Sequence, residues 1–289
     1  MIHFIINGKS GFGNGSKLEN KICEVLDARG IEYEFHRTEY VKHATEIAKQ
    51  LSESGAETIV AVGGDGTVHE VLNGIDVDKV KLGIVPVGSG NDFVDSVNIP
   101  LDVEKSLDII IDGQAKETDF LVCDGVRGLN IIGTGIDVEI LERCERNKFF
   151  KGKLKYFVSL IASLIKFKFY DFKLKKADGQ DEDRSAMIVC CCNGRNFGGG
   201  IPMCPIAEAA DNQMDFIIVG KMKRSKIPGY LIKLMKGKIL ELDFTSFERK
   251  ERVQIDFDKP VTIQIDGELY DGLKFDVSVV KHGIKIFRP

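Results

Sequence analysis

The sequence predicts an α/β N-terminal domain with a doubly wound, mostly parallel sheet, followed by a mainly antiparallel β-sandwich domain. Apolar runs typical of strands alternate with helical patterns over residues 1–118, which favours a parallel sheet. Over residues 119–283, short strand-like runs are separated by turn signals, which favours antiparallel pairing. Three glycine-rich turns follow strands in the first region, at the position where open α/β sheets bind ligands.

The N-terminal region is predicted to alternate strands and helices. β-branched and apolar runs predict the strands, and apolar residues three or four positions apart predict the helices. Gly30 and Gly55 follow two of these helices and suit their C-terminal ends. The expected strands are 2–6, 31–35, 58–62 and 82–87, and the expected helices lie near 18–26, 44–51, 68–74 and 103–111.

The C-terminal region is predicted to be rich in strands, with helical inserts near 138–168 and 225–238. Two strand pairs flank turn signals at Asp124-Gly125 and Asp178-Gly179. Because no flexible linker is visible, we expect the domains to pack closely and the site to lie in the cleft between them. The expected strands are 118–123, 128–132, 172–176, 186–192, 216–219, 246–257, 261–265, 273–280 and 284–287.

Composition argues against several classes of protein. A net charge of -4 and a pI near 5.8 disfavour a nucleic-acid partner. The seven cysteines include no C-x-x-C pair and are interpreted as reduced core residues, and the five histidines show no metal-ligand spacing. The N-terminus lacks the features of a secretory leader, and the longest apolar stretch, Tyr156–Ile165, falls far short of the roughly 20 residues of a membrane span. We therefore expect a cytoplasmic protein.

The most informative motif is Gly63-Gly64-Asp65-Gly66-Thr67, directly after the apolar strand Thr58–Val62. The glycines allow backbone N–H groups to approach a phosphate closely, and the start of the following helix favours negative charge. The Asp65 carboxylate would repel a bare phosphate, so we expect a magnesium ion between the two. The motif therefore predicts a nucleotide phosphate together with a metal ion.

Two further turns accompany this motif. Residues 7–16 carry four glycines after the first strand but match neither the P-loop nor the dinucleotide pattern, so a mobile turn is an equal alternative. Gly88-Ser89-Gly90-Asn91-Asp92-Phe93 follows the strand at 82–87, and Asp92 taken alone would be a helix cap. Because all three turns end strands of one sheet, we expect them to converge at one edge.

The turns at Gly63–Thr67 and Val87–Phe93, together with three later motifs, resemble the diacylglycerol kinase catalytic family. That family includes bacterial soluble lipid kinases and sphingosine kinases. The resemblance spans almost the whole chain, although NAD kinases are similar at Gly63–Thr67 alone. The later motifs are Asn130–Gly135, Asn193–Gly200 and Ile265–Glu268.

The resemblance implies that residues 1–118 bind ATP, that residues 119–283 bind a lipid, and that the last strand, near 284–289, returns to the first domain. Gly8 stands where the family commonly has proline, which could loosen the first turn. By motif position, the nucleotide contacts would be Asn7, Gly8, Lys9, Ser10, Gly11, Thr38, Gly63, Gly64, Asp65, Gly66, Thr67, Val68, His69, Ser89, Asn91 and Asp92.

The resemblance also names the catalytic acids. The family residue that matches Glu268 is the proton acceptor, and phosphoryl transfer needs such a group to deprotonate or orient the hydroxyl. Glu268 is therefore the first candidate and Asp266 the second, while Asp65 would act by holding Mg²⁺. On local grounds Asp266-Gly267 is first of all a hairpin turn.

Further metal ligands follow from the resemblance. Asp119 matches a family acid near the site, but a surface acid at a domain boundary is an equal interpretation. Residues 205–215 resemble a structural metal loop, with the Asp211 carboxylate and the carbonyls of Glu208 and Gln213 as ligands. Asn212 replaces the usual glycine and tolerates left-handed backbone geometry. A plain turn is the alternative.

These expectations combine into an ATP-dependent lipid kinase, with diacylglycerol to phosphatidic acid as the default reaction. The alternatives are an NAD kinase-like enzyme and a nucleotide-binding regulator without activity. Basic stretches at 148–176 and 221–238 fit either solvated helix faces or peripheral contact with an anionic membrane surface. The resemblance is compatible with a homodimer, and the sequence does not determine the oligomeric state.

Overall fold

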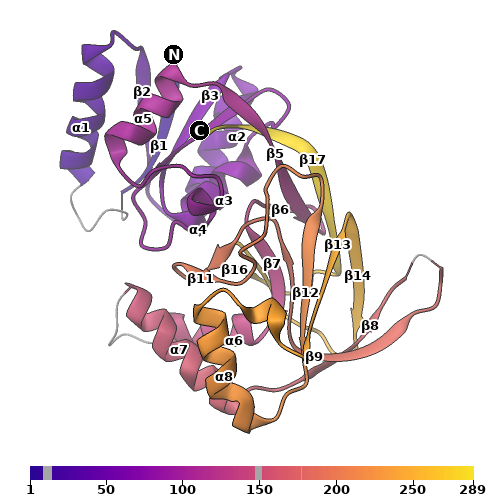
Figure 1. Ribbon diagram of the computed structural model, residues 1–289. Helices are drawn as coiled ribbons and strands as arrows, with labels where there is room; N and C mark the ends of the chain where they lie inside the picture. Colours follow the sequence, from indigo (N-terminus) through magenta and orange to yellow (C-terminus); the bar gives the residue numbers. More distant parts are fainter. Residues whose placement is uncertain (9–14, 147–151, 177) are drawn as a thin grey trace. The chain divides into compact units, whose positions relative to one another are not determined.

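The computed structural model describes residues 1–8, 15–146, 152–176 and 178–289 (Figure 1). The chain forms two compact units, residues 1–119 with 282–289, and residues 120–281. Two strands, β5 (Ala115–Cys123) and β17 (Phe275–Phe287), carry the chain from one unit to the other. The first unit is therefore assembled from both ends of the chain.

The first unit contains a parallel sheet in the order β17-β4-β3-β1-β2. The doubly wound parallel sheet expected from the sequence is confirmed. The C-terminal end of β17 pairs in parallel with β4 through Lys285 with Lys81 and Ile286 with Leu82, as the expected return of the last strand requires. The other strands are β1 (Ile2–Asn7), β2 (Tyr33–Thr38), β3 (Thr58–Gly63) and β4 (Lys81–Pro86).

The described part of the first unit has five helices beside this sheet. Side chains alternate along a strand, so Phe4 and Ile6 of β1 face one layer and Ile5 faces the other. The Phe4 layer packs with α1 and α5, and α2 packs against β1 and α3. The helices are α1 (Gly15–Ala28), α2 (His43–Glu53), α3 (Asp65–Gly74), α4 (Asp92–Ser96) and α5 (Val103–Asp112).

The second unit is mainly antiparallel, as expected. Strand β9 (Glu182–Cys192) is central. Strands β7 (Ile131–Gly135) and β8 (Tyr170–Leu174) follow one another along one of its edges, and β12 (Met214–Gly220) occupies the other. The remaining strands extend these edges or form short hairpins. They are β6 (Val126–Gly128), β10 (Asn196–Phe197), β11 (Ile201–Pro202), β13 (Thr245–Lys250), β14 (Arg252–Phe257), β15 (Ile263–Ile265) and β16 (Glu268–Tyr270).

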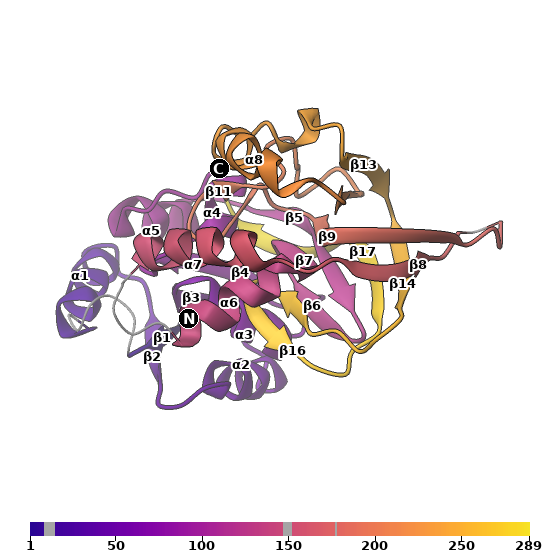
Figure 2. The same ribbon diagram turned by 90° about the horizontal axis from the view of Figure 1, so that it is seen from below.

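Two apolar clusters lie on opposite faces of β9. Cys190 and Cys192 pack into the cluster that contains residues of helices α6 (Ile136–Arg146), α7 (Gly152–Lys166) and α8 (Ile227–Met235). Cys191 belongs to the other cluster, inside the β-sandwich. Figure 2 shows α6 and α7 side by side. All seven cysteines are free of disulfides; five are buried, and Cys23 and Cys144 are partly exposed, so not all of them are core residues.

Several strand boundaries differ from the sequence-based prediction, and in three places the predicted runs are divided differently. The run 246–257 is two strands, β13 and β14, and the runs 273–280 and 284–287 are one continuous strand, β17. The run 128–132 is split between β6 and β7, because the backbone N–H groups of residues 129–131 bind the Asp266 carboxylate. Within the described ranges, no helix is long and apolar enough to cross a membrane.

Candidate nucleotide and phosphoryl-transfer site

The turns after β1, β3 and β4 lie at one edge of the sheet, because the three strands are parallel neighbours. The Asn7 side-chain amide donates to the Thr67 hydroxyl across 3.2 Å. A Cβ on Gly88 would stand 2.3 Å from the Gly64 Cα, so the second and third turns touch through backbone. The expected convergence is present, although Lys9, Ser10 and Gly11 of the first turn lie outside the described residues.

Asp65 connects the second turn to the third. Its Oδ2 accepts from the Asn91 N–H at 2.7 Å and its Oδ1 from the Asp92 N–H at 2.8 Å, with a longer contact of 3.4 Å to the Phe93 N–H. The carboxylate thus lies at the start of α4, where negative charge is favoured. Burial, followed by repulsion from Asp92, raises the pKa of Asp65 to about 6.

Asn91 closes the third turn on itself. Its side chain accepts from the Gly88 N–H at 3.1 Å and donates to the Gly88 carbonyl at 2.8 Å. Its backbone is left-handed, with φ 58°, a conformation that Asn tolerates better than most residues. Asp92 is buried and Ser89 is exposed. Among the three residues expected to contact nucleotide here, only Ser89 therefore presents an exposed side chain.

A small pocket lies at the carboxyl ends of β1 and β2. It brings together Asn7, Thr38 and Thr67, three of the residues expected to bind the nucleotide. By contrast, the side chains of Val68 and His69 are buried within the unit, and His69 contacts Asn73 of the same helix. The pocket also includes residues that the sequence analysis missed, namely Glu39, Tyr40, Val41, Ala44 and Glu70.

The exposure of the missed residues could not be read from the sequence. Tyr40 and Val41 lie two and three residues after β2 ends at Thr38, and they are 51% and 78% exposed. The Tyr40 ring stacks on His43 with centroids 4.2 Å apart. Glu70 accepts from the backbone N–H groups of Lys42 and Ala44, which fixes the loop before α2. The pocket wall is therefore held by α3.

In the second unit, Asp266 fixes a backbone loop. Its carboxylate accepts from the N–H groups of Leu129 at 2.8 Å, Asn130 at 2.8 Å and Ile131 at 3.1 Å. Asp266 and Gly267 both have positive φ, 52° and 92°, and connect β15 to β16 as a two-residue hairpin turn. The predicted hairpin is confirmed.

Glu268 differs from Asp266 in its surroundings. It is the first residue of β16, paired with Ile265, and its side chain is exposed. Both carboxyl oxygens of Asp266, in contrast, are occupied by the backbone of another loop. Of the two candidate bases, Glu268 is thus the acid that is accessible for chemistry.

The two other carboxylates expected to bind metal, Asp119 and Asp211, have structural partners. Asp119 is fully buried and accepts from the His282 N–H at 2.7 Å, so its interpretation as a surface acid is wrong. Asp211 accepts from the Gln213 N–H at 3.1 Å and lies 3.7 Å from the Arg249 guanidinium. Asn212 between them has φ 67°, the left-handed geometry that was expected. Glu208 and Gln213 are exposed.

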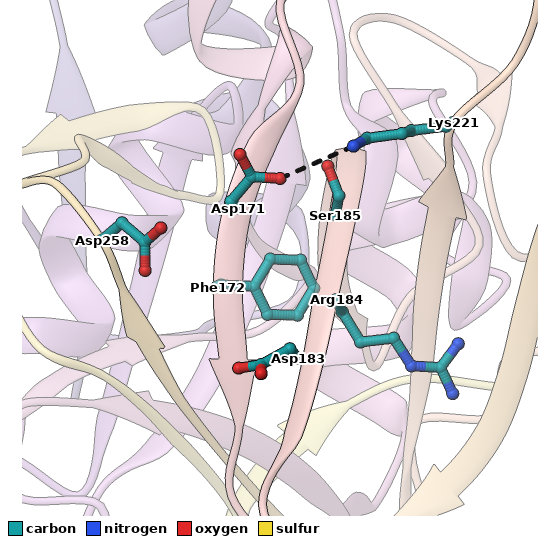
Figure 3. Close-up of a pocket in the computed structure, with 7 residues that line it drawn as sticks. All are labelled: Asp171, Phe172, Asp183, Arg184, Ser185, Lys221 and Asp258. Carbon is teal, nitrogen blue, oxygen red and sulfur yellow. Dashed lines mark ion pairs between the residues drawn. The ribbon is translucent and has the colours of Figure 1, made fainter.

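Two further polar features lie in the second unit. Asp137, at the start of α6, is 2% exposed, and burial raises its pKa to about 7. It was missed, although an acid two residues after Gly133-Thr134-Gly135 is a local signal. Figure 3 shows an open polar pocket with a 3.8 Å ion pair between Lys221 and Asp171. This pocket holds no predicted site residue and is lined by Asp171, Phe172, Asp183, Arg184, Ser185, Lys221 and Asp258.

Both regions of the chain match the sequence models of known protein domains. Residues 1–123 match the diacylglycerol kinase catalytic domain, and residues 130–288 match the YegS C-terminal NAD kinase beta sandwich-like domain. A Mycobacterium tuberculosis protein named diacylglycerol kinase is 26% identical over 296 residues, covering 99% of this chain and 94% of that protein. A Bacillus subtilis protein of the same name is 26% identical over 273 residues, covering 93% and 89%.

The fold is also shared with a solved structure. The crystal structure of a diacylglycerol kinase from Bacillus anthracis superposes with a TM-score of 0.77 at 20% identity, covering 100% of this chain and 96% of that one. The homologues named diacylglycerol kinase indicate a phosphotransferase with an alcohol acceptor. The chain belongs to the diacylglycerol kinase catalytic family.

Proposed function

We propose that this protein is an ATP-dependent lipid kinase that transfers the γ-phosphate of ATP to a lipid hydroxyl, with diacylglycerol as the substrate and phosphatidic acid as the product. The observation that carries the proposal is the edge where Asn7, Asp65 and Thr67 meet the Gly88 turn. Such an edge offers backbone N–H groups and a helix start to phosphates. The names of the relatives supply the lipid.

The residues at this edge are compatible with Mg²⁺. A carboxylate offers about four lone-pair positions, and three N–H groups occupy Asp65, which leaves room for one more contact, directly or through water. When bound, the ion would neutralise charge on the phosphates. The chain's own contribution is positioning, since the turns are held to one another by backbone contacts and by the Asp65 carboxylate.

We assign the proton-accepting role to Glu268. The lipid hydroxyl oxygen bonds to the γ-phosphorus, the bond from that phosphorus to the bridging oxygen of ADP breaks, and the hydroxyl proton passes to Glu268. Its exposed carboxylate supports this role. The occupied carboxylate of Asp266 supports a positioning role for that residue, because it holds the loop at 129–131.

The helices of the second unit offer a surface for peripheral membrane contact. Four large apolar side chains of α7 and α8 are exposed, namely Leu154 at 56%, Phe157 at 38%, Ile232 at 57% and Met235 at 47%. Lysines at 168, 223, 236 and 238 are exposed nearby in sequence. Apolar groups beside lysines favour docking on anionic membranes, where the lipid substrate resides.

The proposal is tested with purified protein, γ-labelled ATP, Mg²⁺ and mixed micelles of several lipids, followed by mass analysis of the labelled product. We expect label in phosphatidic acid, and none when Asp65→Ala replaces the wild type. Label in NAD would instead support the NAD kinase alternative. ATP binding without transfer to any lipid or to NAD would support a nucleotide-binding regulator.

A further inference from the structure

Two histidines and a glutamate meet on one face of the parallel sheet in the first unit. His3 of β1 pairs in register with Glu34 of β2, and His36 is two residues further along β2. Because side chains alternate along a strand, Glu34 and His36 lie on the same face. Phe4 and Phe35 point into the core on the other face. The histidines have no ligand spacing in the sequence, so only strand pairing creates this cluster.

The three side chains present their ligand atoms at metal-binding separations. His3 Nδ1 is 3.2 Å from His36 Nε2 and 3.4 Å from Glu34 Oε2, and the last two atoms are 3.6 Å apart. A tetrahedral ion with bonds of about 2.0–2.1 Å holds its ligand atoms about 3.3–3.4 Å apart. The three observed distances, 3.2, 3.4 and 3.6 Å, lie close to that value and on both sides of it. Among the described parts of the chain, this is the only group of three such residues with atoms close enough to share one ion.

The three side chains of the cluster differ in exposure, as expected for a metal site that is open to solvent on one side. The side chain of His3 is 9% exposed, that of His36 is 20% and that of Glu34 is 54%. The inner ligand is therefore fixed by packing, and the outer side faces solvent. A surface hollow lies beside His36 and is lined by His36, Arg37, Ile47, Gln50, Leu51 and Ser54.

We propose that His3, Glu34 and His36 bind a divalent transition-metal ion of the zinc class. Two imidazoles and one carboxylate suit such ions, whereas Mg²⁺ and Ca²⁺ prefer sites built only from oxygen. The site ties edge strand β2 to β1. His3 lies four residues before Asn7, about 13 Å along β1, and His36 lies two residues before Thr38, about 7 Å along β2. The three ligands therefore differ from the proposed nucleotide contacts.

The test uses metal-free protein and added Zn²⁺, with binding followed by equilibrium dialysis and elemental analysis. We expect about one Zn²⁺ per chain for the wild type and at least tenfold weaker binding for Glu34→Gln and for His36→Ala. Glu32→Gln is the matched control, because Glu32 is exposed just before β2 and lies outside the cluster. The absorption spectrum of bound Co²⁺ should show tetrahedral geometry in the wild type and in the control only.

The alternative is a direct hydrogen bond between the two imidazoles, with no role for metal. In that case Zn²⁺ would not bind, or it would bind equally to the wild type and to both cluster variants, and the proposal would be overturned. Circular dichroism without metal checks each variant's fold, and any variant with the wild-type spectrum decides the question. ATP binding measured on the same samples keeps this outcome separate from the kinase proposal.

Discussion

The Asp65 carboxylate accepts a 2.7 Å hydrogen bond from the backbone N–H of Asn91, 26 residues further along the chain. This bond joins the turn after β3 to the turn after β4. Asp266 makes an equivalent connection in the second unit, where it binds three consecutive N–H groups from Leu129 to Ile131. Asp65 and Asp266, each part of a motif that stands out in the sequence, thus hold in place loops that are distant from them along the chain.

The pH dependence of nucleotide binding should report on Asp65. Its pKa is raised to about 6, so the carboxylate gains a proton as the pH falls through that value, and binding of magnesium–ATP should weaken. Asp92→Asn removes a nearby negative charge, so the pKa of Asp65 should fall and the midpoint should move to lower pH. Calorimetric titration with magnesium–ATP from about pH 5 to 8 measures the midpoint. Asp95→Asn, on the same helix, is the control, and an unchanged midpoint in Asp92→Asn would contradict the assignment.

Gly88→Ala should separate the second and third turns. The new Cβ would stand 2.3 Å from the Gly64 Cα, which is backbone and cannot rotate away. We expect a loss of stability of about 1–3 kcal/mol and at least tenfold weaker ATP binding. Gly229→Ala in α8 is the control, because no atom lies within 4 Å of its added Cβ and alanine favours a helix. Thermal unfolding and ATP titration of both variants test this, and wild-type affinity in Gly88→Ala would refute it.

Substitutions of the two acids in the β15–β16 hairpin should have different effects, one on the catalytic rate and the other on the stability of the fold. Glu268→Gln should lower kcat by about 10²–10⁴ with a nearly unchanged free energy of unfolding, because the side chain is exposed. Asp266→Asn should cost about 1–3 kcal/mol, because one of the loop N–H groups loses its acceptor. Urea unfolding and steady-state kinetics on both variants make the comparison. The assignments would be reversed if Asp266→Asn were inactive but stable while Glu268→Gln retained activity.

Asp137 should make stability depend on pH. Its folded-state pKa of about 7 lies above the ordinary value of 3.8 because of burial, so its contribution is present at low pH and is lost as the pH rises from about 4 through 7. Asp137→Asn should therefore be more stable than the wild type at pH 8, by at most about 4 kcal/mol, and should show a flatter pH dependence. Urea unfolding at several pH values provides the measurement. Asp183→Asn, whose side chain is 87% exposed, should behave like the wild type.

Membrane contact should depend on the exposed face of α7. Replacing Leu154 and Phe157 with serine removes apolar surface without touching the buried side of the helix, and pelleting with anionic vesicles should fall several-fold. Alanine at Lys166 and Lys168 should also weaken pelleting, more so at low salt. Leu101→Ser, at a residue of the first unit that is 65% exposed, is the control. Equal pelleting of all variants would remove the membrane-contact proposal.

Local patterns in the sequence predicted most of the fold. The alternation of strands and helices over β1 to α5 follows from side-chain periodicity, which needs no knowledge of distant residues. The same holds for the hairpin at Asp266-Gly267 and for the left-handed Asn212, since turn geometry depends on residue type. Convergence of the three glycine turns also followed, because parallel neighbouring strands end at one edge.

The sequence by itself determined the two domain classes, the glycine turns and the list of candidate acids, because periodicity and turn chemistry are local properties. Only the tertiary structure decided what each acid does. Asp65 and Asp266 bind loops 26 and more than 130 residues away in the chain, Asp119 is buried, and Glu268 is exposed. Strand pairing likewise brought His3 to His36. Such roles depend on contacts between distant segments, which no local pattern contains.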